Sequence, residues 1–399
     1  LGLELPRPSG FLGAWSILTV ATAPYLFLNL RAAFLSLDPA LEASARSLGA
    51  GPAASFRRAV LPQLRPAFGA GGLIVLLHVL GDFGVVALMR FETFSYALYL
   101  QYASAFDRTY AAWLALMLVA LTAGVLLLEA RWTSGLRLFR AGSGARRQIA
   151  AARLGHWRLP FAGALGVLAL ATVGLPVVAV LFWFFQSPGF SGELFRRALG
   201  GSLSAAGPAA ILAAACAVPV VFLSVRYPSR LARLLERAAY LGYAVPPLAL
   251  ALALIFFTLR SADALYQTLV LLVGAYLLHY LAEALGPVRS GLLAVPPRLE
   301  EAARSLGRGP RSAFLAATFP LLRRSVAISM AIVFLSALKE LPLTFLLSPP
   351  GFETLAVNVW SYTNEAMFAE AAPFALGILG VSGAAVLVLV ARGRHGRVA

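Results

Sequence analysis

Two acidic side chains stand inside long apolar stretches and are the first candidates for chemistry. Asp82 lies in HVLGDFGVVALM, and Glu340 lies in SALKELPLTFLL. A carboxylate within a membrane-length apolar segment is costly and usually faces a cavity or a polar partner. Its oxygen atoms are also the ligands that hard cations prefer. The two residues therefore lie on a translocation path or gate, or they are structural.

The structural alternative differs between the two sites. Asp82 would satisfy backbone groups freed near Gly81 and Gly84, and Glu340 would pair with Lys339 ahead of Pro342. The sequence does not decide between this structural role and a role on the translocation path, so both interpretations stay open.

Asp82 and Glu340 are related by an internal repeat. Residues 39–66 read PALEASARSLGAGPAASFRRAVLPQLRP, and residues 297–324 read PRLEEAARSLGRGPRSAFLAATFPLLRR. The shift of 258 positions that superposes these segments also superposes the two acids. Two copies of a polar segment, each between apolar runs, predict a duplicated membrane protein. We call the segments the first helical loop (39–66) and the second helical loop (297–324).

Each helical loop is predicted to begin with a short helix. Glu42 and Glu300 fall in its first turn, where a negative charge suits the positive end of the helix dipole. Gly49 and Gly307 would end it in the left-handed conformation. A second short helix, at 56–60 or 314–318, then precedes a proline. Each loop is thus expected to be a compact, arginine-bearing structure outside the bilayer.

The second helical loop resembles the EAA loop of binding-protein-dependent ABC importer permeases. Glu301-Ala302-Ala303 is followed by Gly307 and, about a dozen residues later, by Pro320. The first copy departs slightly, because Glu42 stands one place off this spacing. The resemblance implies a type I ABC importer permease fold, in which these loops dock into cytoplasmic ATPase subunits. It assigns that role to Glu42, Ala45, Arg46, Gly49 and Pro62, and to Glu300, Glu301, Ala302, Ala303, Arg304, Gly307 and Pro320.

Longer stretches resemble the fused permeases of ferric-iron importers. These are GDFG with FETFSYALY in the first half, and LKELPLTFLL with GFETLAVNVW in the second. The resemblance implies two ATPase subunits and a periplasmic binding protein that selects and delivers Fe³⁺. That protein would dock on the outer loops 90–108 and 348–370. Related permeases for thiamine, phosphonates or polyamines stay open as alternatives.

Composition independently indicates an all-α polytopic membrane protein. Hydrophobic residues make up 60% of the chain and charged residues 13%, with a mean hydropathy of +0.81. Such apolar runs predict bilayer-spanning helices. We expect nine spans, at about 10–30, 67–89, 109–130, 159–185, 198–225, 238–259, 266–285, 325–347 and 371–391.

The net charge is +16, and we read it from where the arginines lie along the chain. Their distribution predicts membrane topology rather than nucleic-acid binding. Arginines concentrate in alternate segments, and cytoplasmic loops of membrane proteins are rich in arginine and lysine. Both helical loops and the C-terminus are therefore expected in the cytoplasm, with the protein in a bacterial inner membrane. Six spans separate the loops, so the halves would be parallel repeats about an axis along the membrane normal. The arginine-rich segments are 31–66, 131–158, 226–237, 289–324 and 392–397.

Three segments follow from the repeat. Residues 1–131 form the first permease repeat, 132–158 a basic cytoplasmic linker that contacts lipid, and 159–399 the second repeat of about six helices. Leu1 superposes on Leu259, in the middle of the second repeat. We therefore expect the first repeat to be N-terminally incomplete by about three helices.

No residues that could perform catalysis stand out. The chain has no P-loop, so ATP would be bound by partner subunits, and we expect no enzymatic activity, metal site or cofactor of its own. The single Cys216 excludes an intramolecular disulfide. His78 and His279 are expected to hydrogen-bond between helices rather than bind a ligand. The rival class is an ion-driven secondary carrier, which would have no need for two arginine-rich cytoplasmic loops.

Overall fold

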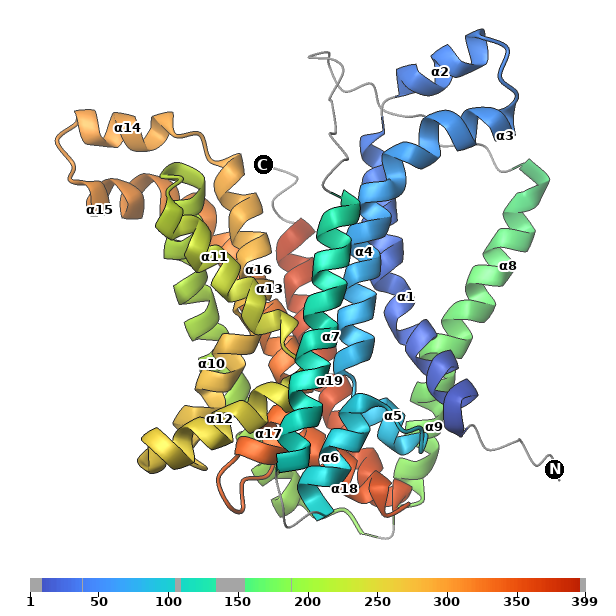
Figure 1. Cartoon of the computed structure of the whole chain (residues 1–399), viewed down its shortest axis with the longest axis vertical. Coiled ribbons are helices and arrows are strands. Elements are labelled where there is room, and N and C mark those ends of the chain that lie inside the picture. Colours follow the sequence, from blue (N-terminus) through green and yellow to red (C-terminus); the bar gives the residue numbers. More distant parts are fainter. Residues whose placement is uncertain (1–8, 38, 105–108, 134–154, 188, 395–399) are drawn as a thin grey trace. The chain divides into compact units, whose positions relative to one another are not determined.

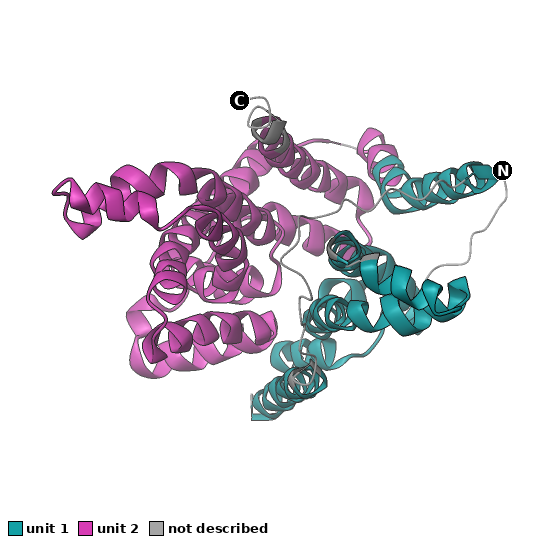
Figure 2. Ribbon diagram, turned by 90° about the horizontal axis from the view of Figure 1, so that it is seen from above, with its two compact units in different colours: residues 1–178 teal, residues 179–399 magenta. Residues whose placement is uncertain are grey.

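The structure is a computed structural model that describes residues 9–37, 39–104, 109–133, 155–187 and 189–394. Every regular element in these ranges is helical. The chain divides into two compact units, Leu1–Val178 and Ala179–Ala399 (Figure 2). Most of the linker predicted at 132–158 lies outside the described residues, so the segment boundaries stay predictions.

Unit 1 is built on three long helices and the first helical loop. The helix α1 packs along α4, and α4 packs along α7. Between α1 and α4, the short elements of the loop lie at one end of α4 (Figure 1). The elements are α1 (Gly10–Ser36), α2 (Pro39–Ser47), α3 (Pro52–Ser55), the π-helical turn η1 (Phe56–Val60), α4 (Leu61–Gly81), α5 (Gly84–Leu88), α6 (Phe94–Ser104), α7 (Thr109–Thr133), η2 (Gly155–Trp157), α8 (Arg158–Ala169) and η3 (Leu170–Gly174), followed by α9 (Leu175–Phe185), which continues into unit 2.

Unit 2 is organised around α10, α13 and α16, which all pack on one another. Its elements are α10 (Gly192–Arg226), α11 (Arg230–Ala244), α12 (Pro247–Ser261), η4 (Asp263–Leu265), α13 (Leu269–Ala294), α14 (Arg298–Ser305), α15 (Pro310–Ala313), η5 (Phe314–Thr318), α16 (Phe319–Leu338), α17 (Pro342–Leu347), α18 (Leu355–Asn364) and α19 (Phe368–Arg394).

Small side chains let the three central helices of unit 2 approach closely. Ala206, Ala209 and Ala213 of α10 are fully buried. The Ser329 hydroxyl of α16 donates a 3.1 Å hydrogen bond to the Ala284 carbonyl of α13. Membrane helices associate through this combination of small residues and interhelical hydrogen bonds, because lipid tails are as apolar as the helices themselves.

The repeat read from the sequence recurs in the helices. The shift of 258 carries α3 onto α15 and η1 onto η5 with identical boundaries. The short helices predicted at 56–60 and 314–318 are thus confirmed, and each is a π-helical turn that runs directly into a long helix. Pro52 and Pro310 open a helix at its first turn, where a missing N–H costs nothing.

Eight helices within the described residues are long and apolar enough to cross a membrane. The span expected at 238–259 is wrong as a single helix, because α11 and α12 meet at an angle of 107° and form at most one broken span. The spans expected at 67–89 and 325–347 also stop early, because α4 ends at Gly81 and α16 at Leu338. Both interruptions fall beside the intramembrane acids.

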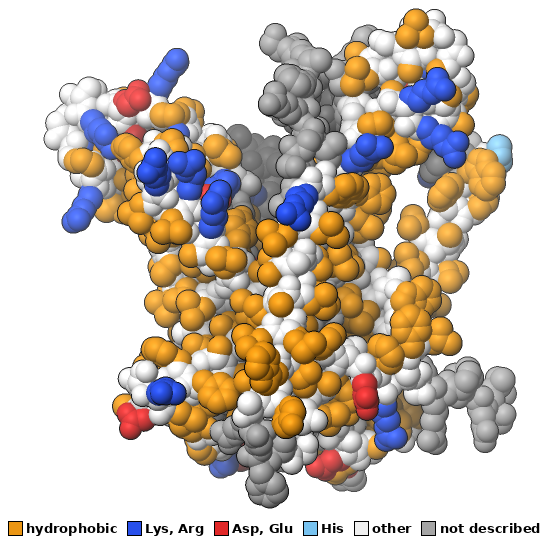
Figure 3. All heavy atoms as spheres, in the orientation of Figure 1, with side chains coloured by type: hydrophobic (Ala, Val, Ile, Leu, Met, Phe, Trp, Pro, Cys, Tyr) orange, Lys and Arg blue, Asp and Glu red, His pale blue; other side chains and the backbone are white. Residues whose placement is uncertain are grey.

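Charge is segregated along the helices within each unit. Hydrophobic side chains cover the middle of the helices, whereas Lys and Arg side chains gather at the end that carries α14 in unit 2 and α2 in unit 1 (Figure 3). This pattern, with the spanning helices, makes the chain an integral membrane protein.

Candidate functional site

The second helical loop is held together by a buried glutamate. Glu300, in the first turn of α14, is 7% exposed. Its carboxylate accepts a 2.8 Å hydrogen bond from the Arg304 guanidinium and a 3.4 Å hydrogen bond from the Thr318 hydroxyl of η5. One side chain thereby joins α14 to the turn that leads into α16.

Arg304 ties the same loop to the end of α10. Its guanidinium donates a 3.1 Å hydrogen bond to the Tyr227 hydroxyl, next to the last residue of α10. That hydrogen bond, and then the Glu300 carboxylate, raise the pKa of Arg304 above its ordinary value, so the charge persists. Beside it, Phe314 of η5 packs edge-on against Phe222 of α10, with ring centroids 5.0 Å apart.

Two half-buried arginines hold the base of this loop in place. Arg226, the last residue of α10, donates a 2.6 Å hydrogen bond to the Val295 carbonyl just after α13. Arg289 of α13 forms a 2.6 Å ion pair with Glu236 of α11. Both contacts join helices at the end where the loop begins.

The first helical loop repeats the central ion pair in a more open setting. Arg46 lies 2.7 Å from Glu42, and the Glu42 side chain is 40% exposed. Glu42 therefore corresponds structurally to Glu300, because each pairs with the arginine four residues later. Glu301, the glutamate of the EAA pattern, is exposed instead.

In both loops the first short helix ends at a glycine with the same backbone conformation. Gly49 and Gly307 have φ values of +84° and +85°, as the sequence predicted. The next N–H reaches back five residues, from Ala50 to the Ala45 carbonyl at 3.1 Å in the first loop, and from Arg308 to the Ala303 carbonyl at 3.2 Å in the second. This is the Schellman arrangement, which a glycine adopts without strain.

The turn presents a leucine at the tip of each loop. Leu48 is 88% exposed and Leu306 is 84% exposed, immediately before the two glycines. Sequence reasoning did not single these leucines out, although their matching positions were visible in the repeat. Of the other predicted loop residues, Ala45 and Ala303 are half-buried, Ala302 is exposed, and Pro62 and Pro320 open α4 and α16.

The two intramembrane acids occupy equivalent breaks in the helices. Asp82 accepts a 3.0 Å hydrogen bond from the N–H of Val85, at the start of α5. Glu340 accepts a 3.1 Å hydrogen bond from the N–H of Leu343, at the start of α17. Each carboxylate thus binds a backbone donor that the break leaves without an intrahelical partner.

Glu340 is the more enclosed of the two. It is 8% exposed and also accepts a hydrogen bond from the Tyr280 hydroxyl of α13. Its backbone carbonyl accepts from Thr344 at 2.7 Å. The sequence suggested Lys339 as the partner of Glu340. Among the described residues, the hydrogen-bond donors to its carboxylate are instead the Tyr280 hydroxyl and the Leu343 N–H.

Two further polar side chains of the spans link neighbouring helices. His279 bonds through Nδ1 to the Gly242 carbonyl of α11 at 3.1 Å, which confirms the expected link between helices. Glu283 accepts a 2.7 Å hydrogen bond from Ser336 of α16. Within the described part of the chain, no three His, Cys, Asp or Glu side chains are placed to hold a metal ion.

Each unit combines helices long enough to span a membrane with a matching helical loop, the arrangement expected of a duplicated membrane transport protein. The family model described as "Binding-protein-dependent transport system inner membrane component" matches residues 5–136 and 207–396. The chain belongs to this family of ABC importer permeases. Permeases of this family work with ATPase and substrate-binding partners.

The chain is also similar to individual known proteins. The chain is 34% identical over 390 residues to "Fe(3+)-transport system permease protein FbpB 2" of Haemophilus influenzae, covering 96% of this chain and 77% of the relative. It is 25% identical over 202 residues to "Putative 2-aminoethylphosphonate transport system permease protein PhnV" of Salmonella typhimurium, covering 49% and 76%. A solved bacterial ABC transporter involved in the import of alginate matches with a TM-score of 0.45 at 14% identity, covering 61% of this chain and 96% of that chain.

Proposed function

We propose that this chain is the ferric-iron permease of an ABC importer in a bacterial inner membrane. A periplasmic binding protein would deliver Fe³⁺, and two cytoplasmic ATPase subunits would drive transport. The observation that carries the substrate is the 34% identity to a Fe³⁺-transport permease over 96% of the chain. Hydrolysis of ATP would belong to the partner subunits, and the permease itself would need no cofactor.

The two helical loops are the proposed docking points for the ATPase subunits. Each loop exposes a leucine at its tip, and in the second loop Glu301, in the first turn of α14, is exposed as well. Ion pairs inside each loop keep it compact, so a push on the tip would be transmitted to the long helix that follows. Closure of the ATPase subunits would then tilt α4 and α16 and alternate access to the path.

Asp82 and Glu340 are proposed to lie at the outer part of that path. Both stand at helix breaks, where backbone groups and carboxylates come together. Such broken spans line substrate sites in other transporters. Asp82 is the stronger candidate for contact with the cation, because Glu340 is largely enclosed by Tyr280 and α17.

The test is uptake by proteoliposomes that contain the permease, its ATPase and its binding protein. Fe³⁺-loaded binding protein should support ATP-dependent accumulation of ⁵⁵Fe, whereas Glu300→Arg should abolish it while membrane insertion persists. The reversed charge would leave two cations facing each other where Arg304 now has its carboxylate. Continued transport by this variant, with ATPase bound, would contradict the docking assignment.

Uptake by the same proteoliposomes also distinguishes the alternative substrates and the alternative transport class. The match to a putative 2-aminoethylphosphonate permease favours that substrate as the second candidate. Uptake of 2-aminoethylphosphonate with no uptake of iron would show that the substrate is the phosphonate and that the iron assignment is wrong. Uptake driven by an ion gradient without any ATPase subunit would instead show a secondary carrier.

A further inference from the structure

Unit 2 contains an open groove between α10, α16 and α19. The groove has a volume of about 980 Å³. Its walls are apolar, and Phe334 of α16 and Val388 of α19 are examples. Among the described residues that line it, the charged ones are Arg323 and Arg324, near the start of α16, and no acidic side chain is present. The groove therefore combines a cationic end with a hydrocarbon-like interior.

The space exists because the helices present small residues to it. Gly207 and Ala210 of α10, together with Ala331 of α16, line the groove. A Cβ atom built on Gly207 meets no atom within 4 Å, so α10 leaves this part of the groove empty. A molecule that fills this space must itself be apolar, because small side chains leave the apolar walls of the groove uncovered.

The length of the groove matches one leaflet of a bilayer. Phe334 follows Arg323 by eleven residues of α16, which is about 16 Å along a helix. Half of a bilayer's hydrocarbon core is about 15 Å. Arg323 and Arg324 are the last two residues of the second helical loop and lie in the first turns of α16, so they mark the membrane boundary on the loop's side. The assignment of that side to the cytoplasm rests on the proposed function.

We propose that this groove binds an anionic phospholipid of the inner leaflet. The arginines would hold the headgroup phosphate, since guanidinium groups match phosphate oxygens in charge and geometry. One acyl chain would lie along α16 between α10 and α19. Zwitterionic lipids carry a compensating cation, so phosphatidylglycerol should bind better than phosphatidylcholine.

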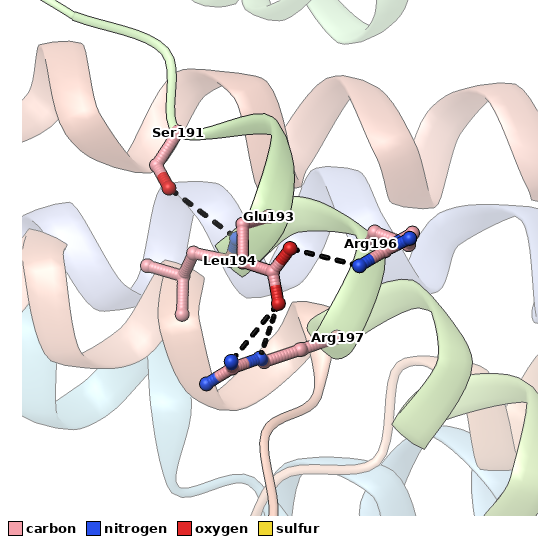
Figure 4. Close-up of polar contacts among 5 residues, drawn as sticks. All are labelled: Ser191, Glu193, Leu194, Arg196 and Arg197. Atoms are coloured by element: carbon pink, nitrogen blue, oxygen red, sulfur yellow. Dashed lines mark hydrogen bonds and ion pairs between the residues drawn. The ribbon is translucent and has the colours of Figure 1, made fainter.

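The opposite end of α10 offers a matched control. Arg196 and Arg197 are also adjacent arginines, and both pair with Glu193, at 2.8 Å and 2.9 Å (Figure 4). Ser191 caps the same helix end by accepting from the N–H of Leu194 at 3.3 Å. Neither of these two arginines lines the groove, so they should contribute nothing to binding there.

The experiment is native mass spectrometry of the full chain, delipidated in mild detergent and titrated with phosphatidylglycerol, phosphatidylcholine or inorganic phosphate. Arg323→Gln with Arg324→Gln should weaken phosphatidylglycerol binding about tenfold or more, at about 1 kcal/mol for each basic residue. Arg196→Gln with Arg197→Gln should leave it unchanged. Equal binding by the wild type and the Arg323/Arg324 variant would overturn the proposal.

A second pair of variants tests the acyl chain. Gly207→Leu should fill the groove and lower phosphatidylglycerol binding, while Gly200→Leu, on the same helix but outside the groove, should not. A Cβ atom at either glycine meets no atom within 4 Å, so the two changes begin from equally open positions. If Gly207→Leu has no effect and inorganic phosphate competes fully, the site takes a phosphate ion and the lipid proposal fails. The readout needs no transport, so a failure of the iron assignment leaves it unaffected.

Discussion

Glu300 and Glu301 are neighbours in sequence with opposite surroundings. Glu300 is buried between Arg304 and Thr318, whereas Glu301 is exposed. The two carboxylates therefore have separable roles, one inside the loop and one available to a partner. The EAA pattern alone does not show this division, because it counts Glu301 as its first letter.

Glu300→Gln should loosen the second helical loop, while Glu301→Gln should not. Loss of a buried, charge-assisted hydrogen bond costs about 1.5–3 kcal/mol. We expect faster amide hydrogen exchange across α14 in Glu300→Gln and unchanged exchange in Glu301→Gln. Equal protection of α14 in both variants would show that the buried ion pair does not hold the loop.

The two helical loops differ at a buried position, which is Ser55 in the first loop. Its hydroxyl is buried and has no hydrogen-bond partner, while Ala313 occupies the equivalent buried place in the second loop. A buried polar group left unsatisfied costs about 1–3 kcal/mol. Ser55→Ala should therefore raise the thermal unfolding midpoint of the purified protein. A lowered midpoint would mean that the hydroxyl has a partner in the membrane-embedded protein.

Elements of unit 2 meet at glycines that admit no side chain. Gly201 of α10 approaches the segment before α18 so closely that a Cβ atom would lie 2.0 Å from the Glu353 carbonyl oxygen. Next to it, the Ser202 hydroxyl accepts a 2.9 Å hydrogen bond from the N–H of Leu355. The helix α10 thus contacts the loop that precedes α18 near one end and the second helical loop at the other.

Gly201→Ala should destabilise unit 2 by about 1–3 kcal/mol, because inserting a methyl group into a filled contact forces the backbone apart. Gly200→Ala is the control, since the adjacent position has open space. Thermal unfolding of the two purified variants makes the comparison. A midpoint for Gly201→Ala equal to that of Gly200→Ala would mean that α10 and the segment before α18 separate freely.

Local signals made the helical loops predictable. A glutamate in a first turn and a glycine at a helix end each act within a few residues, and both were predicted correctly. The prolines were expected to interrupt helices, whereas Pro52 and Pro310 open α3 and α15. The angle between α11 and α12, the tyrosine that holds Glu340 and the groove beside α16 were not predicted. Tyr280 and Glu340 lie 60 positions apart, and only packing of α13 against α17 brings them together.

Across the whole chain, the duplication extends to what the loops present to a partner. Single exposed apolar side chains are common on protein surfaces and need no explanation. Here, however, the same residue type is almost fully exposed at the same position in both units, at Leu48 and Leu306. Two matching apolar tips on compact, charged loops are what the proposed docking into two ATPase subunits requires.

Leu48→Asp and Leu306→Asp should each weaken binding of the ATPase subunits, and the double variant should abolish it. A carboxylate forced into an apolar pocket without a partner costs several kcal/mol, and losing about 1.4 kcal/mol already weakens binding tenfold. The amount of ATPase that co-purifies with the tagged permease measures the effect. Leu306→Met is the conservative control and should retain the subunits, because methionine fills a similar volume. Full retention by the double Asp variant would place the contact elsewhere on the loops.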